Sequence, residues 1–279
     1  MPKFNRINGF LILCALSLTL FIYCNGSGTT ATGDNGDNGD TTGDTSGTGL
    51  ENPTSAVIAN HSAVDSFDNI PDSVIEFISE NFNFYYGHTS HGSQIITGLN
   101  MLQYENALYA KPSFYERSDD LGTLGDTSWV TNLRYRLDQG TYNIAMMSWC
   151  GGVSTNTTAG INTYLSKMDE LESDYPDVLF IYMTGHLDGT GDAGNLRAMN
   201  NLIRSYCNAN EKILFDFADI ESYDPDGTFY ADGSDACEWC LDWCASNDCP
   251  SCDNCARSHC YNCYVKGKAF WWLMSKLAP

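Results

Sequence analysis

The stretch that decides the fold is FNFYYGHTSHGSQIITGLNML, residues 82–102. Its first part, FNFYYG, is apolar and aromatic and predicts a short buried strand. A polar turn, GHTSHG, follows, and SQIITGLNML then places Ile95, Ile96, Leu99 and Leu102 on one side of a helix. A strand that passes through a polar turn into a helix is the repeating unit of an α/β protein.

The rest of the chain repeats this alternation. Three further apolar runs predict strands: YNIAMMSW (142–149), DVLFIYMTG (177–185) and KILFDFAD (212–219). Helical periodicity marks four other segments: 70–82, 161–175, 195–207 and 265–277. Strands that alternate with helices predict a mostly parallel sheet covered on both faces, and right-handed crossovers make it a three-layer α/β sandwich. In the last helix we expect Trp271 and Trp272 to pack in the core.

The N-terminal region has the composition of an export signal and a tether. Lys3 and Arg6 precede an uncharged apolar run that ends before Cys24, as in a bacterial signal peptide covering residues 1–24. The arrangement resembles a bacterial lipoprotein, which implies lipidation of Cys24 and a membrane-anchored, periplasmic or cell-surface protein. The alternatives are a secreted protein cut at a nearby bond and an uncleaved anchor. Residues 25–55, rich in Gly, Thr and Asp, predict a disordered tether, and 56–279 the folded domain.

The charge of the chain excludes some partners. The sequence has 35 acidic and 14 basic residues, a net charge of −21, and every acidic residue follows Cys24. A surface this acidic repels phosphate backbones and anionic headgroups. We therefore expect no nucleic-acid partner.

Cysteines are concentrated near the C-terminus. Eight lie between Cys237 and Cys263, and Cys150 and Cys207 complete an even number after the signal. An even number in an exported chain favours disulfides, whereas the C-x-x-C spacings would also suit zinc or an iron–sulfur cluster. We expect a cysteine-rich loop cap, 237–263, that is cross-linked in a pairing the sequence leaves open. No metal and no cofactor is expected.

Polar motifs follow each predicted strand. They are GHTSHG, SWCGG, TGHLDG and FADIESYDPDG, and they contain His88, His91 and His186. In a parallel sheet, ligands bind beyond the carboxyl ends of the strands, so these turns are where chemistry is expected. A serine at a strand-to-helix turn can attack a carbonyl group if a histidine removes its proton.

The order of these motifs resembles that of the SGNH, or GDSL-like, hydrolases, and in particular a set of bacterial exported or lipoprotein members. The resemblance implies a flavodoxin-like fold, Ser90 as the nucleophile with Thr89 as second choice, and His259 as the base. Leu187 stands where that family has an asparagine, so His186 would take the polar role. Asp219, at the end of the fourth predicted strand, is the leading carboxylate to orient the histidine. The residues expected to line the site are Thr89, Gly151, Gly152, Gly185, His186, Asp188, His88 and His91.

The expected function is therefore that of an exported serine esterase acting on acyl esters of small molecules or glycans. A second hypothesis is a zinc hydrolase, with His88, His91 and His186 as ligands together with Asp188 or His259. A third is a non-catalytic surface protein that binds a glycan or a partner. Its stacking residues would be the aromatic side chains Tyr85, Tyr86, Trp129, Trp149, Trp239 and Trp243.

Overall fold

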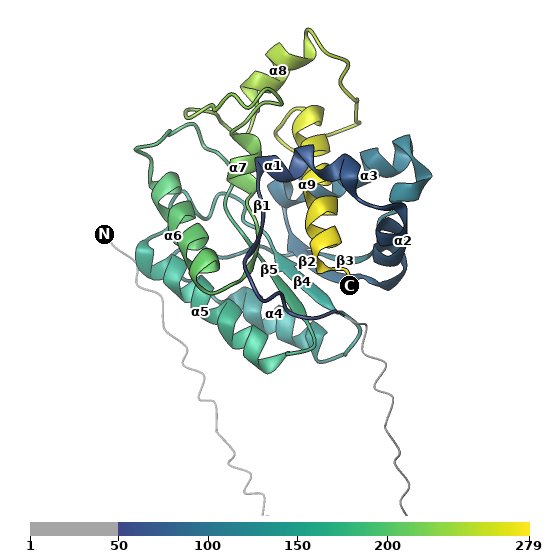
Figure 1. Cartoon of the computed structure of the whole chain (residues 1–279). Helices are drawn as coiled ribbons and strands as arrows, with labels where there is room; N and C mark the ends of the chain where they lie inside the picture. Colours follow the sequence, from purple (N-terminus) through teal and green to yellow (C-terminus); the bar gives the residue numbers. More distant parts are fainter. Residues whose placement is uncertain (1–49) are drawn as a thin grey trace, which may run out of the picture. The chain divides into compact units, whose positions relative to one another are not determined.

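The computed structural model describes residues 50–279, so the expected export signal and most of the expected tether lie outside the described residues. The centre of the described part is a six-stranded, all-parallel sheet in the order β1-β6-β5-β4-β2-β3 (Figure 1). The strands are β1 (Val57–Ala59), β2 (Asn83–His88), β3 (Ser113–Ser118), β4 (Ile144–Met147), β5 (Leu179–Met183) and β6 (Ile213–Phe215).

Four of these strands, β2, β4, β5 and β6, are the four predicted from apolar runs. The two outer strands, β1 and β3, were not predicted. β1 has only three residues, and β3 has the sequence SFYERS with side chains that are exposed or half-buried. A strand at the edge of a sheet has less surface to bury, so its apolar pattern is weak.

Helices cover both faces of the sheet, which confirms the α/β architecture (Figure 1). One layer contains α1 (His61–Asp65), α2 (Asp72–Asn81), α3 (Ser93–Glu105) and α9 (Cys260–Leu277). The other contains α4 (Ser128–Leu137), α5 (Thr158–Asp174) and α6 (Asn195–Ala209). The short helices α7 (Phe217–Glu221) and α8 (Glu238–Cys244) lie beyond the carboxyl ends of the strands, and single turns of 3-10 helix occur at η1 (Phe67–Asn69), η2 (Ser90–Gly92) and η3 (Ala107–Tyr109).

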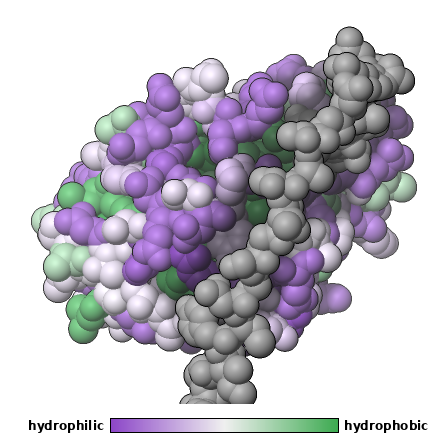
Figure 2. All heavy atoms as spheres, turned by 90° about the horizontal axis from the view of Figure 1, so that it is seen from below, coloured by the Kyte–Doolittle hydropathy of each residue, from purple (hydrophilic) through white to green (hydrophobic). Residues whose placement is uncertain are grey.

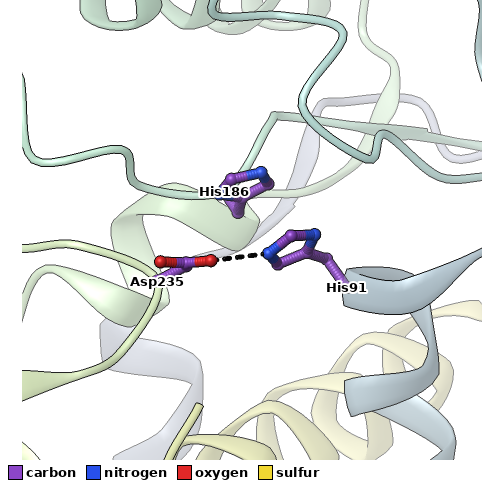
Figure 3. Close-up of side chains that lie close together, drawn as sticks. All are labelled: His91, His186 and Asp235. Carbon is purple, nitrogen blue, oxygen red and sulfur yellow. Dashed lines mark hydrogen bonds and ion pairs between the residues drawn. The ribbon is translucent and has the colours of Figure 1, made fainter. Parts of the chain in front are cut away.

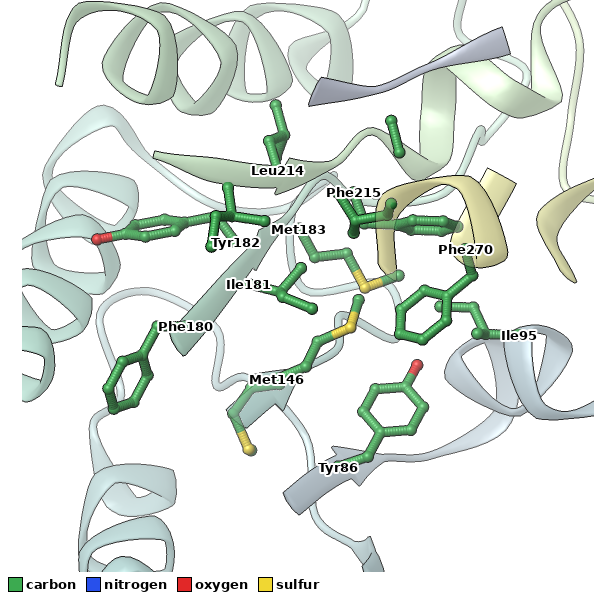
Figure 4. Close-up of a cluster of buried hydrophobic side chains, with 14 of the residues drawn as sticks. Tyr86, Ile95, Met146, Phe180, Ile181, Tyr182, Met183, Leu214, Phe215 and Phe270 are labelled. Carbon is green, nitrogen blue, oxygen red and sulfur yellow. The ribbon is translucent and has the colours of Figure 1, made fainter. Parts of the chain in front are cut away.

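The core forms where the central strands meet the helices. Every residue of β4 and of β5 is buried, as expected for parallel strands covered on both faces. Figure 4 shows Met146 and Ile181 from these strands close to Phe270 of α9. Trp271 is fully buried and Trp272 packs against the same core, so the prediction for the two tryptophans is confirmed.

Helices α3 and α9 approach each other unusually closely. Gly98 of α3 faces Gly267 of α9, and a methyl group added at Gly98 would collide with the backbone carbonyl oxygen of Cys263. Only glycine leaves room for two helix backbones at this separation. The contact fixes α9, and with it the end of the cysteine-rich segment, against the helix that follows β2.

The cysteine-rich segment is cross-linked by four disulfides. The pairs are Cys237–Cys240, Cys244–Cys249, Cys252–Cys260 and Cys255–Cys263. The expectation of disulfides among these eight cysteines is thus confirmed. In the part of the chain that the structure describes, Cys150 and Cys207 form no disulfide.

The face shown in Figure 2 is mostly hydrophilic, with separate smaller hydrophobic areas among the polar side chains. Within residues 50–279 no helix combines the length and the apolar composition needed to cross a bilayer.

Candidate functional site

The topology of the sheet marks one position for a binding site. The five strands β3-β2-β4-β5-β6, numbered from one in chain order, have the order 2-1-3-4-5. In such doubly wound sheets, ligands bind beyond the carboxyl ends of the strands where the direction of winding reverses, which here lies between β2 and β4. The turns that leave these two strands contain the motifs GHTSHG and SWCGG.

His91 is the central residue of this position. It lies in the turn η2 between β2 and α3 and is 3% exposed. Its Nε2 is 2.8 Å from Oδ2 of Asp235, and its Nδ1 is 3.4 Å from Sγ of Cys150 (Figure 3 shows the contact with Asp235). Cys150 is three residues beyond the end of β4, and Asp235 comes from the loop before α8. Three segments far apart in sequence therefore meet at one imidazole.

The hydrogen bonds of His91 select its tautomer. An ionised carboxylate can only accept, so Nε2 of His91 donates to Asp235. In the neutral ring the lone pair is then on Nδ1, the nitrogen that faces the Cys150 thiol. This is the arrangement in which an imidazole can remove a proton from a nucleophile while a third group orients it.

Burial keeps His91 in its neutral form. Desolvation lowers the pKa of His91 below its usual value, and the neighbouring His186 lowers it further. The hydrogen bond to Asp235 opposes this shift by stabilising the protonated ring. With its pKa lowered overall, His91 is available as a proton acceptor at neutral pH.

His186 lies directly over His91. The two rings are stacked with centroids 3.6 Å apart and planes 9° from parallel (Figure 3). Nδ1 of His186 donates to the carbonyl oxygen of Leu187 at 2.7 Å, while Nε2 is buried and has no hydrogen-bond partner within residues 50–279. Because the neutral ring carries one N–H, Nε2 of His186 has an unused lone pair.

His91, His186 and Asp235 also form a candidate metal site. Ligand atoms of His91, His186 and Asp235 all lie within 4.8 Å of one another. A zinc ion binds along the nitrogen lone pairs, which lie in the plane of each ring. Two stacked, nearly parallel rings direct their lone pairs along parallel planes that do not meet. One ring would have to turn before both could bind one ion, so the observed arrangement favours proton transfer over metal binding.

A buried ion pair supports the turn that contains His186. Lys266 of α9 and Glu221 of α7 are both fully buried, and Nζ of Lys266 is 2.6 Å from Oε1 of Glu221. The other carboxylate oxygen of Glu221 accepts the backbone N–H of Leu187 at 2.8 Å. The turn after β5 is thereby fixed to α7 and α9.

Ser90 and Thr89 lie next to His91 in sequence. Ser90 has a φ of +25°, a strained value for a residue with a side chain. Thr89 donates from Oγ1 to Oδ2 of Asp120 at 3.1 Å, and Asp120 also accepts hydrogen bonds from the backbone of Leu121 and Cys150. Burial is the largest cause that raises the pKa of Asp120, to about 6. Asp120 therefore links the turn after β2 to the turn that contains Cys150.

The expected pair of His259 and Asp219 is replaced by other contacts. His259 caps α9, where its Nδ1 accepts the backbone N–H of Tyr261 at 3.1 Å. Asp219 accepts from Nδ1 of His61 at 2.5 Å and from the backbone N–H of the same residue. No hydrogen bond among the described residues joins Ser90, His259 and Asp219 into a triad. The physical reason is that α1 begins at His61 beside α7, so that His61 forms the hydrogen bonds to the carboxylate of Asp219.

The other predicted site residues lie around this edge of the sheet with partners of their own. His88 contacts Glu116 at 3.0 Å, and Gly185 donates its backbone N–H to Asn200. Asp188 accepts from Thr190. Gly151 and Gly152 follow Cys150 directly, and Gly151 has a φ of +77°. Of the predicted set, His91 and His186 are the two that the structure brings together.

Two residues of the cluster were not anticipated in these roles. Cys150 was counted only as a possible disulfide partner, although it is a cysteine outside the cysteine-rich segment and at the end of a buried strand. Asp235 is 144 residues from His91 along the chain and lies in an irregular loop. No local pattern distinguishes it from the many other acidic residues.

The fold and the site together define a doubly wound α/β protein with a thiol, an imidazole and a carboxylate in contact at its switch point. No protein-family model matches the chain, and a search of curated proteins found no match.

Proposed function

We propose that the protein is an exported hydrolase that cleaves acyl esters by covalent catalysis, with Cys150 as the nucleophile, His91 as the base and Asp235 as the group that orients the base. The observation that carries the proposal is the position of His91, with Nε2 bonded to Asp235 and Nδ1 facing the thiol. The nucleophile therefore contacts the base, and the base contacts the carboxylate that orients it.

The proposed reaction has two halves. His91 takes the thiol proton on Nδ1, and the Cys150 thiolate attacks the carbonyl carbon of the ester. The tetrahedral intermediate collapses to a thioester on Cys150, and the alcohol leaves with the proton from His91. Water then gives a proton to His91 and attacks the thioester, which releases the acid and restores the thiol.

The surroundings of Cys150 support this chemistry. Cys150 is half-buried, and Asp235 has about a quarter of its side chain exposed, so the cluster adjoins solvent although His91 does not. The backbone N–H groups of Gly151 and Gly152 lie next to the nucleophile in sequence. They are the candidates for stabilising the negative charge that develops on the carbonyl oxygen.

The likeness to SGNH hydrolases stays part of the proposal. The strand order 2-1-3-4-5 suits a flavodoxin-like sheet, and the strained φ of Ser90 is the specific observation in favour of a serine nucleophile. In that second candidate, an exported serine esterase, Ser90 replaces Cys150 and one of the neighbouring histidines replaces His259 as the base.

The location and the substrate are inferred from the sequence and the disulfides. The apolar N-terminal run, Cys24 and the four disulfides are typical of a lipid-anchored or secreted protein in an oxidising compartment. We infer a small-molecule or glycan ester as the substrate and no nucleic-acid partner.

The test compares nucleophiles on a short activated ester such as 4-nitrophenyl acetate. Cys150→Ala should abolish hydrolysis, and iodoacetamide should inactivate the protein with modification of Cys150 in the mass spectrum. Cys207→Ala, which removes the other free thiol, is the matched control and should remain active. Labelling of Ser90 by a fluorophosphonate, with loss of activity in Ser90→Ala and full activity in Cys150→Ala, would instead establish the serine esterase. Loss of activity on chelation would point to a metal at His91, His186 and Asp235.

A further inference from the structure

The proposed mechanism gives no role to His186, the second histidine of the cluster. His186 is only 8% exposed, and its Nε2 has no hydrogen-bond partner among the described residues, although buried polar atoms are nearly always hydrogen-bonded. Its other nitrogen is held by the carbonyl oxygen of Leu187, and that turn is held in place by Glu221. The lone pair therefore has a fixed direction that the fold itself maintains.

The other two residues of the cluster, His91 and Asp235, do not donate to this nitrogen. The ring of His91 is stacked face to face with that of His186, so the N–H of His91 points along its own plane and goes to Asp235. Asp235 has only acceptors when ionised. A bound molecule with a hydrogen-bond donor would supply the missing partner.

From this we infer that the substrate carries a hydroxyl group close to its scissile ester, and that this hydroxyl donates a hydrogen bond to Nε2 of His186. The inference rests on the proposed hydrolase and names its substrate class, the hydroxylated esters, as in partly acylated polyols and sugars. Nε2 of His186 is closed to solvent in this structure, so the hydroxyl reaches it only when a neighbouring side chain, such as the partly exposed Asp235, moves aside. A site that hydrogen-bonds a substrate hydroxyl strongly rejects the analogue without the hydroxyl, because the buried acceptor of the site is then left unpaired. An apolar pocket discriminates far less between substrates that differ by one small group.

The binding of the hydroxyl is tested without turnover. The variant Cys150→Ala, uniformly labelled with ¹⁵N in its histidine rings, is titrated with 2-hydroxyethyl acetate and with ethyl acetate, and separately with ethyl lactate and ethyl propionate. The first pair differs by a hydroxyl on the alcohol and the second by a hydroxyl on the acyl group. We expect the Nε2 resonance of His186, assigned by its absence in His186→Gln, to shift with the hydroxylated member of at least one pair and not with its analogue. No shift with any of the four esters, or the same shift within both pairs, overturns the inference.

Kinetics on the unaltered protein give the second measurement. For at least one pair we expect kcat/KM to be about 100-fold or more higher with the hydroxyl than without it. His186→Leu should bring this ratio close to one, and His186→Gln should retain part of it because the amide oxygen also accepts. Equal kcat/KM values within both pairs would overturn the hydroxyl requirement while leaving the hydrolase intact. If the unaltered protein hydrolysed none of the four esters, this would count against the proposed function alone. The titration of Cys150→Ala measures binding and does not depend on turnover.

Discussion

The ammonium group of Lys266 lies 2.6 Å from the carboxylate of Glu221, and neither side chain reaches solvent. Desolvation is the main cause that lowers the pKa of Lys266, to about 8, and Glu221 opposes it. Gln94 accepts a further hydrogen bond from Lys266, and Asn262 donates to Glu221. A charge pair so enclosed fixes the geometry around the site, because either charge alone would be costly in this position.

Removal of one partner of this pair should therefore be far worse than removal of both. We expect Lys266→Met to lower the free energy of unfolding by about 3–5 kcal/mol, since it leaves Glu221 charged and unpaired. The double variant Lys266→Met with Glu221→Gln should recover most of this loss, because the amide oxygen of Gln can still accept from Leu187. Urea unfolding of the unaltered protein, the two single variants Lys266→Met and Glu221→Gln, and the double variant gives the coupling energy between the two side chains. Additive effects would show that the two side chains do not stabilise each other.

The pH dependence of hydrolysis should report on His91. Because its pKa is lowered, His91 stays an acceptor at a lower pH than an ordinary histidine, and kcat/KM should fall only below about pH 6.5. Asp235→Asn removes a partner that raises this pKa, so the acid limb should move to lower pH. The maximal rate should fall by about 100-fold or more, because the charge that favours the protonated ring is gone. An acid limb that moves to higher pH in Asp235→Asn would contradict the assigned roles.

Asp120 should make the protein less stable as the pH rises toward neutrality. Its pKa in the folded protein is about 6, above the ordinary value of 3.8, so the folded state binds the proton more tightly between these two values. The resulting stabilisation is present at low pH and is lost as the pH rises through about 6. Asp120→Asn cannot ionise, so its stability relative to the native protein should increase from pH 4 to pH 7. Thermal melts of both proteins across this range test the sign, and a difference independent of pH would disprove the shift.

The close contact of α3 and α9 should not accept a side chain. Gly98→Ala places a methyl group against the backbone of α9, which must move, and we expect a loss of about 2 kcal/mol or more despite the better helix propensity of alanine. Asn100→Ala, an exposed position on the same helix, is the matched control and should change stability by less than about 0.5 kcal/mol. Equal melting temperatures for the two variants would show that the helices separate without cost.

The sequence identified the central strands because burial on both faces requires continuous apolar runs, as in IAMM and LFIYM. β1 and β3 were not predicted because strands at the edge of a sheet can be short or polar. The turns around the site were also located correctly, because each one begins where an apolar run ends. His91 and His186 were among the predicted residues, since each lies three residues beyond the end of its strand, β2 or β5.

The assignment of partners within the site is a different matter. Asp219 follows β6 as expected, yet it contacts His61, a residue outside every predicted motif. Asp235 reaches His91 only because a long loop folds back over the sheet. Such pairings depend on the path of irregular segments in three dimensions, and neither periodicity nor turn chemistry encodes that path.

Asp235 lies two residues before the first disulfide, Cys237–Cys240, and thus just outside the segment that the four disulfides cross-link. The strands of the sheet and both histidines carry none of these links, whereas α9 carries Cys260 and Cys263 of two of them. Under the proposed mechanism, the carboxylate that orients His91 therefore lies beside a covalent cross-link. We expect hydrolysis to depend on the oxidation of cysteines that take no part in the reaction itself.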